Sequence, residues 1–292
     1  MSPAVATELR LPLGNLTIAA KAWGDPAHPP MLALHGWLDN AGTFDRLAPL
    51  LQHRYIVAID LAGHGRSDHR GVGNWYAYVD FLDEIAAVIA HFGWTRVDLL
   101  GHSLGATLVS AYAAIAPHQV GRLSLVEGLG PLTTPSEKTL DVLQRAVAAR
   151  AAFTGQGLRV FASIEAAVEA RCRAGSLSFD AARCIVERGL KEFDASANAG
   201  EAGYVWSSDP RLMLPSAQRF TEQQLSALLD GIRAPTLLIL AQPEAPYLAR
   251  AMIEARIARV ADIEVVRLPG NHHVHLENAA AVSAAMHAFL AR

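Results

Sequence analysis

One stretch of the chain limits the fold more than any other: Leu99-Leu100-Gly101-His102-Ser103-Leu104-Gly105-Ala106. It is typical of an apolar strand that ends at a Gly-x-Ser-x-Gly turn and runs into a helix of small residues. On such a sharp turn Ser103 has a strained backbone, and side chains at positions 101 and 105 would collide with the neighbouring strand and helix. The turn lifts the Ser103 hydroxyl above the sheet edge, at a helix N-terminus that favours developing negative charge.

Apolar strands alternate with helices on both sides of this turn. Predicted strands span residues 7–11, 16–22, 31–34, 55–59, 97–100, 123–126, 236–240 and 263–268, and predicted helices span 44–51, 75–92, 104–116, 246–260 and 277–290. This alternation implies a mostly parallel central sheet with helices on both faces, in which ligands bind beyond the carboxyl ends of the strands. Six polar residues follow predicted strand ends: His35, Asp60, Ser103, Glu127, Glu244 and His272.

The alternation stops in the middle of the chain. Residues 131–229 contain no convincing strand, and alanine-rich helical segments dominate at 140–152, 164–174 and 179–190. A length of 292 residues fits one large α/β domain with an inserted subdomain. We therefore expect a core domain made of residues 1–130 and 230–292, and a helical cap formed by residues 131–229.

Composition narrows the function classes. A net charge of −3 and an isoelectric point near 6.5 give no basic footprint, so nucleic acid is not an expected partner. The first residues lack a positive region followed by an apolar core, and no apolar run is long enough to cross a bilayer. Cys172 and Cys184 fit no zinc or redox spacing. We predict a cytoplasmic protein without a membrane partner, metal or organic cofactor; its oligomeric state stays open.

Four motifs in this order resemble the α/β-hydrolase superfamily: His35-Gly36-Trp37, Gly63-His64-Gly65-Arg66-Ser67-Asp68, the turn at Ser103, and Pro269-Gly270-Asn271-His272. The resemblance covers nearly the whole chain outside the cap. The longer stretches 20–24, 34–40 and 269–275 are similar to the serine hydrolase-like branch. That branch implies a hydrolase, but its natural substrates are poorly defined, so it adds little about the substrate.

The resemblance assigns Ser103 as the nucleophile and His272 as its base. A serine hydroxyl attacks poorly without a neighbouring base. His272 follows a predicted strand and a tight Pro-Gly-Asn turn, which would bring it back over the sheet edge. His273 and His275 are not expected to be catalytic.

Two carboxylates fit the usual chain order of serine, acid and histidine. Glu244 follows the strand at 236–240, which is the superfamily's commonest acid position. Glu127 follows the preceding strand, where haloalkane dehalogenases often carry their acid, and the stretch 241–245 is similar to a dehalogenase loop that has lost its acid. We favour Glu127 and keep Glu244 as the alternative.

The backbone N–H groups of Leu104 and Trp37 are the expected oxyanion hole. We expect His35 to stabilise its loop, His102 to pack beneath the turn, and Trp206 or Met213 of the cap to lie near the pocket.

These residues predict a serine hydrolase that cleaves small or medium acyl or aryl esters through an acyl-enzyme intermediate. Hydrolysis of a lactone, thioester, amide or C–C bond remains open, because all share the oxyanion geometry. A non-catalytic ligand sensor with the same fold is the alternative of another class. Dehalogenase or epoxide-hydrolase chemistry is disfavoured, because those members place an aspartate where Ser103 stands.

Overall fold

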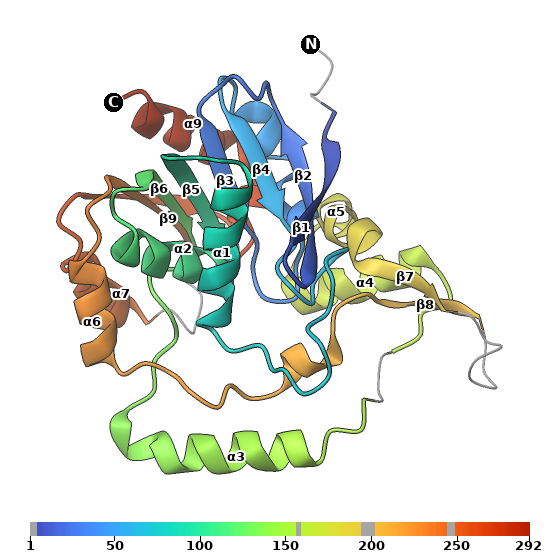
Figure 1. Cartoon of the computed structure of the whole chain (residues 1–292). Helices are drawn as coiled ribbons and strands as arrows, with labels where there is room; N and C mark the ends of the chain where they lie inside the picture. The colour runs from blue at the N-terminus through green and yellow to red at the C-terminus, as the bar shows by residue number, and fades with distance from the viewer. Residues whose placement is uncertain (1–4, 156–158, 194–201, 244–248) are drawn as a thin grey trace.

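The computed structural model describes residues 5–155, 159–193, 202–243 and 249–292 (Figure 1). Eight strands of the described residues form one sheet in the order β1-β2-β4-β3-β5-β6-β9-β10, parallel except where β2 pairs with β1 and β4. The predicted α/β architecture is confirmed. The strands are β1 (Thr7–Leu13), β2 (Leu16–Trp23), β3 (Pro30–Leu34), β4 (Tyr55–Ile59), β5 (Val97–His102), β6 (Val120–Val126), β9 (Thr236–Gln242) and β10 (Ile263–Pro269).

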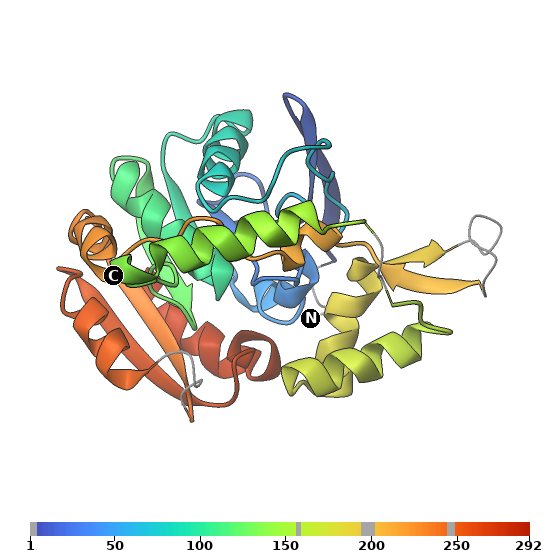
Figure 2. The same cartoon turned by 90° about the horizontal axis from the view of Figure 1, so that it is seen from below.

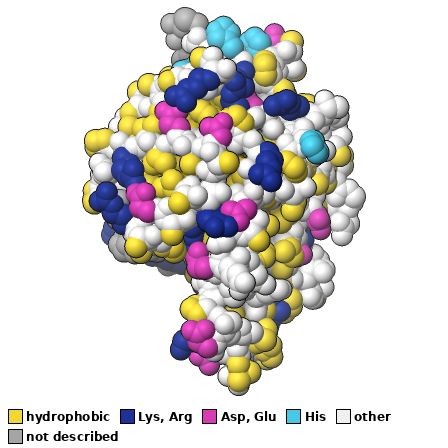
Figure 3. Space-filling view, turned by 90° about the vertical axis from the view of Figure 1, so that its left-hand side faces the viewer, with side chains coloured by type: hydrophobic (Ala, Val, Ile, Leu, Met, Phe, Trp, Pro, Cys, Tyr) yellow, Lys and Arg dark blue, Asp and Glu magenta, His cyan; other side chains and the backbone are white. Residues whose placement is uncertain are grey.

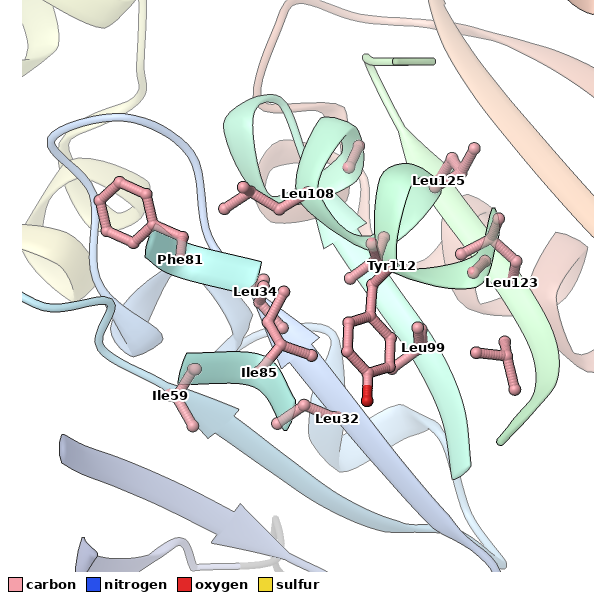
Figure 4. Close-up of a cluster of buried hydrophobic side chains, with 14 of the residues drawn as sticks. Leu32, Leu34, Ile59, Phe81, Ile85, Leu99, Leu108, Tyr112, Leu123 and Leu125 are labelled. Atoms are coloured by element: carbon pink, nitrogen blue, oxygen red, sulfur yellow. The ribbon is translucent and has the colours of Figure 1, made fainter. Parts of the chain in front are cut away.

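Helices cover both faces of the sheet, and each strand supplies side chains to two cores. In β3, Leu32 and Leu34 face one core, while Met31 and Ala33 face the other. Figure 4 shows the first core, beneath helices α1 and α2. Strands buried on both faces are apolar without interruption, which is why the sequence lacks the alternating pattern of a half-exposed sheet. The core helices are α1 (Asp80–His91), α2 (Leu104–Ile115), α6 (Glu222–Asp230), α7 (Arg250–Ile257), α8 (Val274–Glu277) and α9 (Ala279–Leu290).

The turn between β5 and α2 has the strained geometry that the sequence predicts. Ser103 has φ 51° and ψ −114°, a conformation that side chains rarely adopt. A Cβ added at Gly101 would lie 2.5 Å from the backbone of Ala106, and one at Gly105 would lie 2.0 Å from the carbonyl oxygen of Leu34. Both glycines are therefore required by close backbone approach.

Two expected core helices differ from the structure. The helix expected at 75–92 begins only at Asp80, because Tyr76 and Tyr78 donate hydrogen bonds to Asp209 and to the Thr107 carbonyl and hold residues 75–79 outside the helix. The helix expected at 44–51 does not form. A 3-10 turn, Ala41–Phe44, ends where that helix was expected to begin, and a second 3-10 turn, Ala48–Leu50, follows it.

Residues 131–229 contribute no strand to the central sheet among their described parts. Up to Trp206 they form α3 (Thr139–Ala151), α4 (Ile164–Gly175) and α5 (Phe179–Gly189), followed by the two-stranded sheet of β7 (Leu190–Phe193) and β8 (Gly203–Trp206). The end of the range belongs to the core instead, because Leu225 and Leu229 of α6 pack in the first core. The expectation that this region lacks strands was wrong at β7 and β8. Each has only four residues, too few for a clear period of two, and no compact turn motif joins them.

The segment 131–229 lies at the carboxyl end of the sheet. Figure 2, seen from that end, shows α3 crossing in front of the strand ends, with α4 and α5 to one side. In Figure 3 the lower part of the molecule narrows to a projection that carries both hydrophobic and charged side chains. Among the described residues, no helix combines the length and apolar character needed to span a bilayer.

We predict that Gly105→Ala lowers the free energy of unfolding by more than about 3 kcal/mol, because the added methyl group would overlap the Leu34 carbonyl. Urea unfolding followed by circular dichroism measures this. Gly71→Ala is the matched control: its Cβ would lie 3.5 Å from the nearest atom, in ordinary contact, and we expect a change within about 0.5 kcal/mol. Equal effects of the two substitutions would contradict the steric explanation.

Candidate active site

The predicted nucleophile lies where three segments meet. The N–H of Ser103 donates to the carbonyl of Val126 at 2.9 Å, which ties the turn to the end of β6. On the other side, a Cβ added at Gly36 would lie 3.2 Å from Cβ of Ser103, so the loop after β3 passes directly against the serine. Ser103 itself is half-buried. Its hydroxyl-bearing carbon is therefore fixed between the ends of β3 and β6.

Glu127 and His272 are in direct contact. Oε2 of Glu127 lies 3.1 Å from Nδ1 of His272, and Oε1 accepts a hydrogen bond from the backbone N–H of Ala241 at 2.5 Å. The carboxylate is buried, so both oxygens depend on protein donors. Since a carboxylate only accepts hydrogen bonds, Nδ1 carries the proton in this pair and Nε2 has the lone pair that a base needs.

His102 connects the histidine loop to the serine turn. Its Nε2 donates to the backbone carbonyl of His272 at 2.8 Å, and the two rings are 4.8 Å apart. Burial, reinforced by the neighbouring histidines, lowers the pKa of His102 well below its ordinary value. His102 is therefore a neutral packing residue beneath the turn, as the sequence predicts, and it ties the backbone of His272 to the residue before Ser103.

The two predicted oxyanion donors come from adjoining segments. Leu104 is the first residue of α2, and the first N–H groups of a helix have no partner within it. Trp37 lies one residue after Gly36, in the loop that passes against Ser103, and its indole Nε1 donates to the Leu212 carbonyl at 3.2 Å. The Trp37 side chain is 49% exposed, so it forms part of the rim rather than the core.

Comparison with known proteins identifies the family. A family model described as alpha/beta hydrolase fold matches residues 29–167. Serine hydrolase-like protein 2 of Homo sapiens is 31% identical to this chain over 309 residues, covering 99% of this chain and 95% of that protein. The chain belongs to the α/β-hydrolase superfamily.

Solved structures of other α/β hydrolases are similar over almost the whole chain. A hypothetical protein from Pseudomonas aeruginosa PAO1 has a TM-score of 0.89 and 38% identity, covering 98% of this chain and 99% of that one. A thioesterase domain from the curacin biosynthetic pathway has a TM-score of 0.82 and 26% identity, covering 96% and 98%. The relative from Homo sapiens, rather than these structures, identifies the chain as a member of the serine hydrolase-like branch.

The structure describes three of the four other residues that the sequence analysis singled out. Glu244, the alternative acid, lies outside the described residues. His35 stabilises its loop: Nδ1 donates to the Gly36 carbonyl, Nε2 accepts from the N–H of Leu61, and burial lowers its pKa to about 4. Met213 is exposed beside Leu212, which Trp37 contacts. Trp206 instead packs on Phe161, 5.4 Å between ring centroids, among the hydrophobic residues of α4 and α5.

Sequence reasoning missed a buried ion pair behind the site. Asp39, which follows Trp37 and Leu38, accepts hydrogen bonds from Arg171 of α4 and, at 3.2 Å, from Nε2 of His273. Burial opposes ionisation of Asp39 most strongly, but the Arg171 charge and His273 together hold the pKa of its carboxyl below the ordinary value. This pair fastens the loop of Trp37 to α4. Asp39 was visible in the sequence motif, but nothing marked Arg171 among the arginines of α4.

Asp39, His102 and His273 also offer ligand atoms within 4.8 Å of one another, as a metal site would. The Arg171 guanidinium, however, donates to Asp39 and lies 3.4 Å from Nε2 of His273. A second cation there would face that positive charge across a buried space. The cluster is better explained as an ion pair of the hydrolase than as a metal centre.

We predict that Arg171→Met lowers the free energy of unfolding by about 3 kcal/mol, because it leaves the buried Asp39 carboxylate without its cation. The double variant Asp39→Asn, Arg171→Met should recover part of that loss. Arg173→Met is the matched control on the same helix, since Arg173 is exposed and faces Glu169 at 3.8 Å; we expect a change below about 0.5 kcal/mol. Additive losses in the double variant would show that Asp39 and Arg171 are not coupled.

Proposed function

We propose that this hydrolase is a carboxylesterase that uses Ser103, His272 and Glu127 as a catalytic triad. The single observation that carries the proposal is the contact of 3.1 Å between Glu127 and His272 beside the strained serine turn. A neutral histidine whose Nδ1–H is held by a buried carboxylate has its Nε2 prepared to accept a proton from a serine hydroxyl.

In the proposed reaction, Ser103 Oγ attacks the ester carbonyl while His272 takes its proton. The N–H groups of Trp37 and Leu104 donate to the oxyanion of the tetrahedral intermediate. His272 then protonates the leaving alcohol as the C–O bond breaks and an acyl-Ser103 ester remains. A water molecule, deprotonated by His272, attacks that ester. The bond to Ser103 Oγ then breaks, Oγ takes the proton back from His272, and the carboxylic acid is released. Glu127 orients His272 and stabilises its charged form in both halves.

Glu127 is supported as the acid by its burial and by two held oxygens. Its backbone φ of 57° turns the chain sharply at the end of β6, and the N–H of Ala241 holds the second oxygen. A carboxylate fixed in this way keeps the histidine in one tautomer.

The ester class is supported by the exposed side chain of Trp37, which presents an apolar surface on the loop that passes against Ser103. The structural similarity to a thioesterase domain makes thioesters the first alternative, since an acyl-enzyme forms from either bond. A ligand sensor without catalysis is the alternative outside the enzymes.

Ser103→Ala should abolish labelling by a fluorophosphonate probe and hydrolysis of para-nitrophenyl butyrate, because the probe and the ester both need the serine oxygen. Gel fluorescence and a spectrophotometric assay measure the two. Ser110→Ala is the control, since Ser110 lies on α2 with its hydroxyl bonded to the Ala106 carbonyl, away from the turn. A folded native protein that takes up no label would support the sensor instead.

Glu127→Gln should lower kcat for the same ester by about 10³-fold or more, because the amide no longer fixes the histidine tautomer or stabilises its charge. Glu244→Gln should change kcat by less than about three-fold. Steady-state kinetics of the two variants compares the candidate acids. A larger loss in Glu244→Gln would transfer the role of triad acid to Glu244.

A further inference from the structure

A hollow lies between α3 and the segments 75–79 and 214–220. We call it the arginine cleft. It has a volume of about 300 Å³ and is lined on one side by the aromatic rings of Trp75, Tyr78 and Phe220. Three arginines, Arg150, Arg211 and Arg219, also line it, and no aspartate or glutamate does.

The charge of this cleft is opposite to that of the whole protein, which has a net charge of −3. Arg211 is neutralised by Asp209, at 2.6 Å. Arg150 and Arg219 have no carboxylate partner within the described ranges of the chain. Two uncompensated guanidinium groups in a concave site concentrate positive potential there and attract anions.

Arg150 is held in place for such a role. Its guanidinium carbon lies 4.8 Å from the centre of the Trp75 ring, and its Nε is buried without a hydrogen-bond partner in the described structure. Stacking on an aromatic ring fixes the plane of a guanidinium while its N–H groups remain able to donate to a carboxylate or phosphate. A buried donor without a partner is unfavourable unless a ligand completes it.

The cleft and the candidate nucleophile are connected through two contacts. The hydroxyl of Tyr78, which lines the cleft, donates to the Thr107 carbonyl at 2.7 Å. Thr107 is four residues after Ser103, or about 6 Å along the axis of α2. On the other side, Leu212 accepts from the Trp37 indole, and the chain continues within two residues to Leu214 in the wall of the cleft. Exposed Met213 lies between them.

From these observations we infer that the arginine cleft binds an anionic group at the far end of the substrate. The preferred substrate is then an ester whose apolar chain runs along Trp37 and Met213 and ends in a carboxylate that pairs with Arg150 and Arg219. Apolar walls suit the chain, and the two guanidinium groups suit its terminal anion. This inference rests on the proposed function, since it places the scissile bond at Ser103.

The test compares two esters of equal chain length, para-nitrophenyl octanoate and the mono-para-nitrophenyl ester of suberic acid. The wild-type protein should hydrolyse the suberate monoester with the higher kcat/KM. Arg150→Gln should lower kcat/KM for the suberate monoester about ten-fold, because the substitution removes a charge-assisted hydrogen bond to its carboxylate. The same substitution should change kcat/KM for the octanoate less than about two-fold, because that ester has no carboxylate to bind. Arg150→Lys should keep part of the preference, and added salt should weaken it.

Arg173→Gln, an exposed arginine on α4, is the control and should leave the preference unchanged. A second pair of esters, para-carboxyphenyl octanoate and phenyl octanoate, carries the anion on the alcohol part instead of the acyl part. A preference for para-carboxyphenyl octanoate that Arg150→Gln removes would also support an anion site, one that receives the alcohol part of the substrate. Hydrolysis of the neutral esters without preference for either anionic partner would overturn the inference and leave the esterase proposal standing.

Binding of suberate to Ser103→Ala, measured by calorimetry, tests the cleft without catalysis. We expect binding that Arg150→Gln weakens about ten-fold and Arg173→Gln does not. If no ester is hydrolysed by the wild-type protein but suberate binds in this manner, the esterase proposal fails and the anion site remains. If suberate binds Ser103→Ala equally weakly by itself, with Arg150→Gln and with Arg173→Gln, the anion site is contradicted.

Discussion

The structure depends on the close approach of backbones around Ser103. β3, β5 and the start of α2 come so near one another that positions 101 and 105 have no space for a Cβ, and Ser103 itself has a left-handed φ. Such a conformation is unfavourable by roughly 1–3 kcal/mol and persists only where the surroundings determine it fully. Here the buried strands on either side supply that constraint, so the position of the serine is set by the core of the protein.

Hydrogen bonds that begin at this turn connect several other residues of the site. The N–H of Ser103 donates to the carbonyl of Val126, and Glu127, the residue after Val126, contacts His272. The carbonyl of His272 in turn accepts a hydrogen bond from His102, the residue before Ser103. The contacts form a closed circuit through three strand ends. Displacement of one of these loops would therefore disturb the other two.

The segment 131–229 is attached to the core unevenly. α4 and α5 are fixed by buried polar contacts: Arg171 binds Asp39, Asn40 donates to the Ile185 carbonyl, and Arg188 binds Asp60. By contrast, α3 buries only Ala146 completely and exposes Leu140, Leu143 and Val147. The side of the site next to α4 and α5 is thus held by more buried contacts than the side bounded by α3, where the arginine cleft lies.

The sequence by itself determined the strands of the central sheet, most of its helices and the turn at Ser103, because parallel strands buried on both faces and the two glycines leave distinct local patterns. It also indicated His272, through a motif, and reduced the acid to two candidates. Only the tertiary structure brought Glu127 to His272 and Arg171 to Asp39, and only it gathered Arg150 and Arg219 into one cleft. Those pairs join residues far apart in the chain through side-chain contacts, and a local pattern carries no information about which distant charge a side chain will meet.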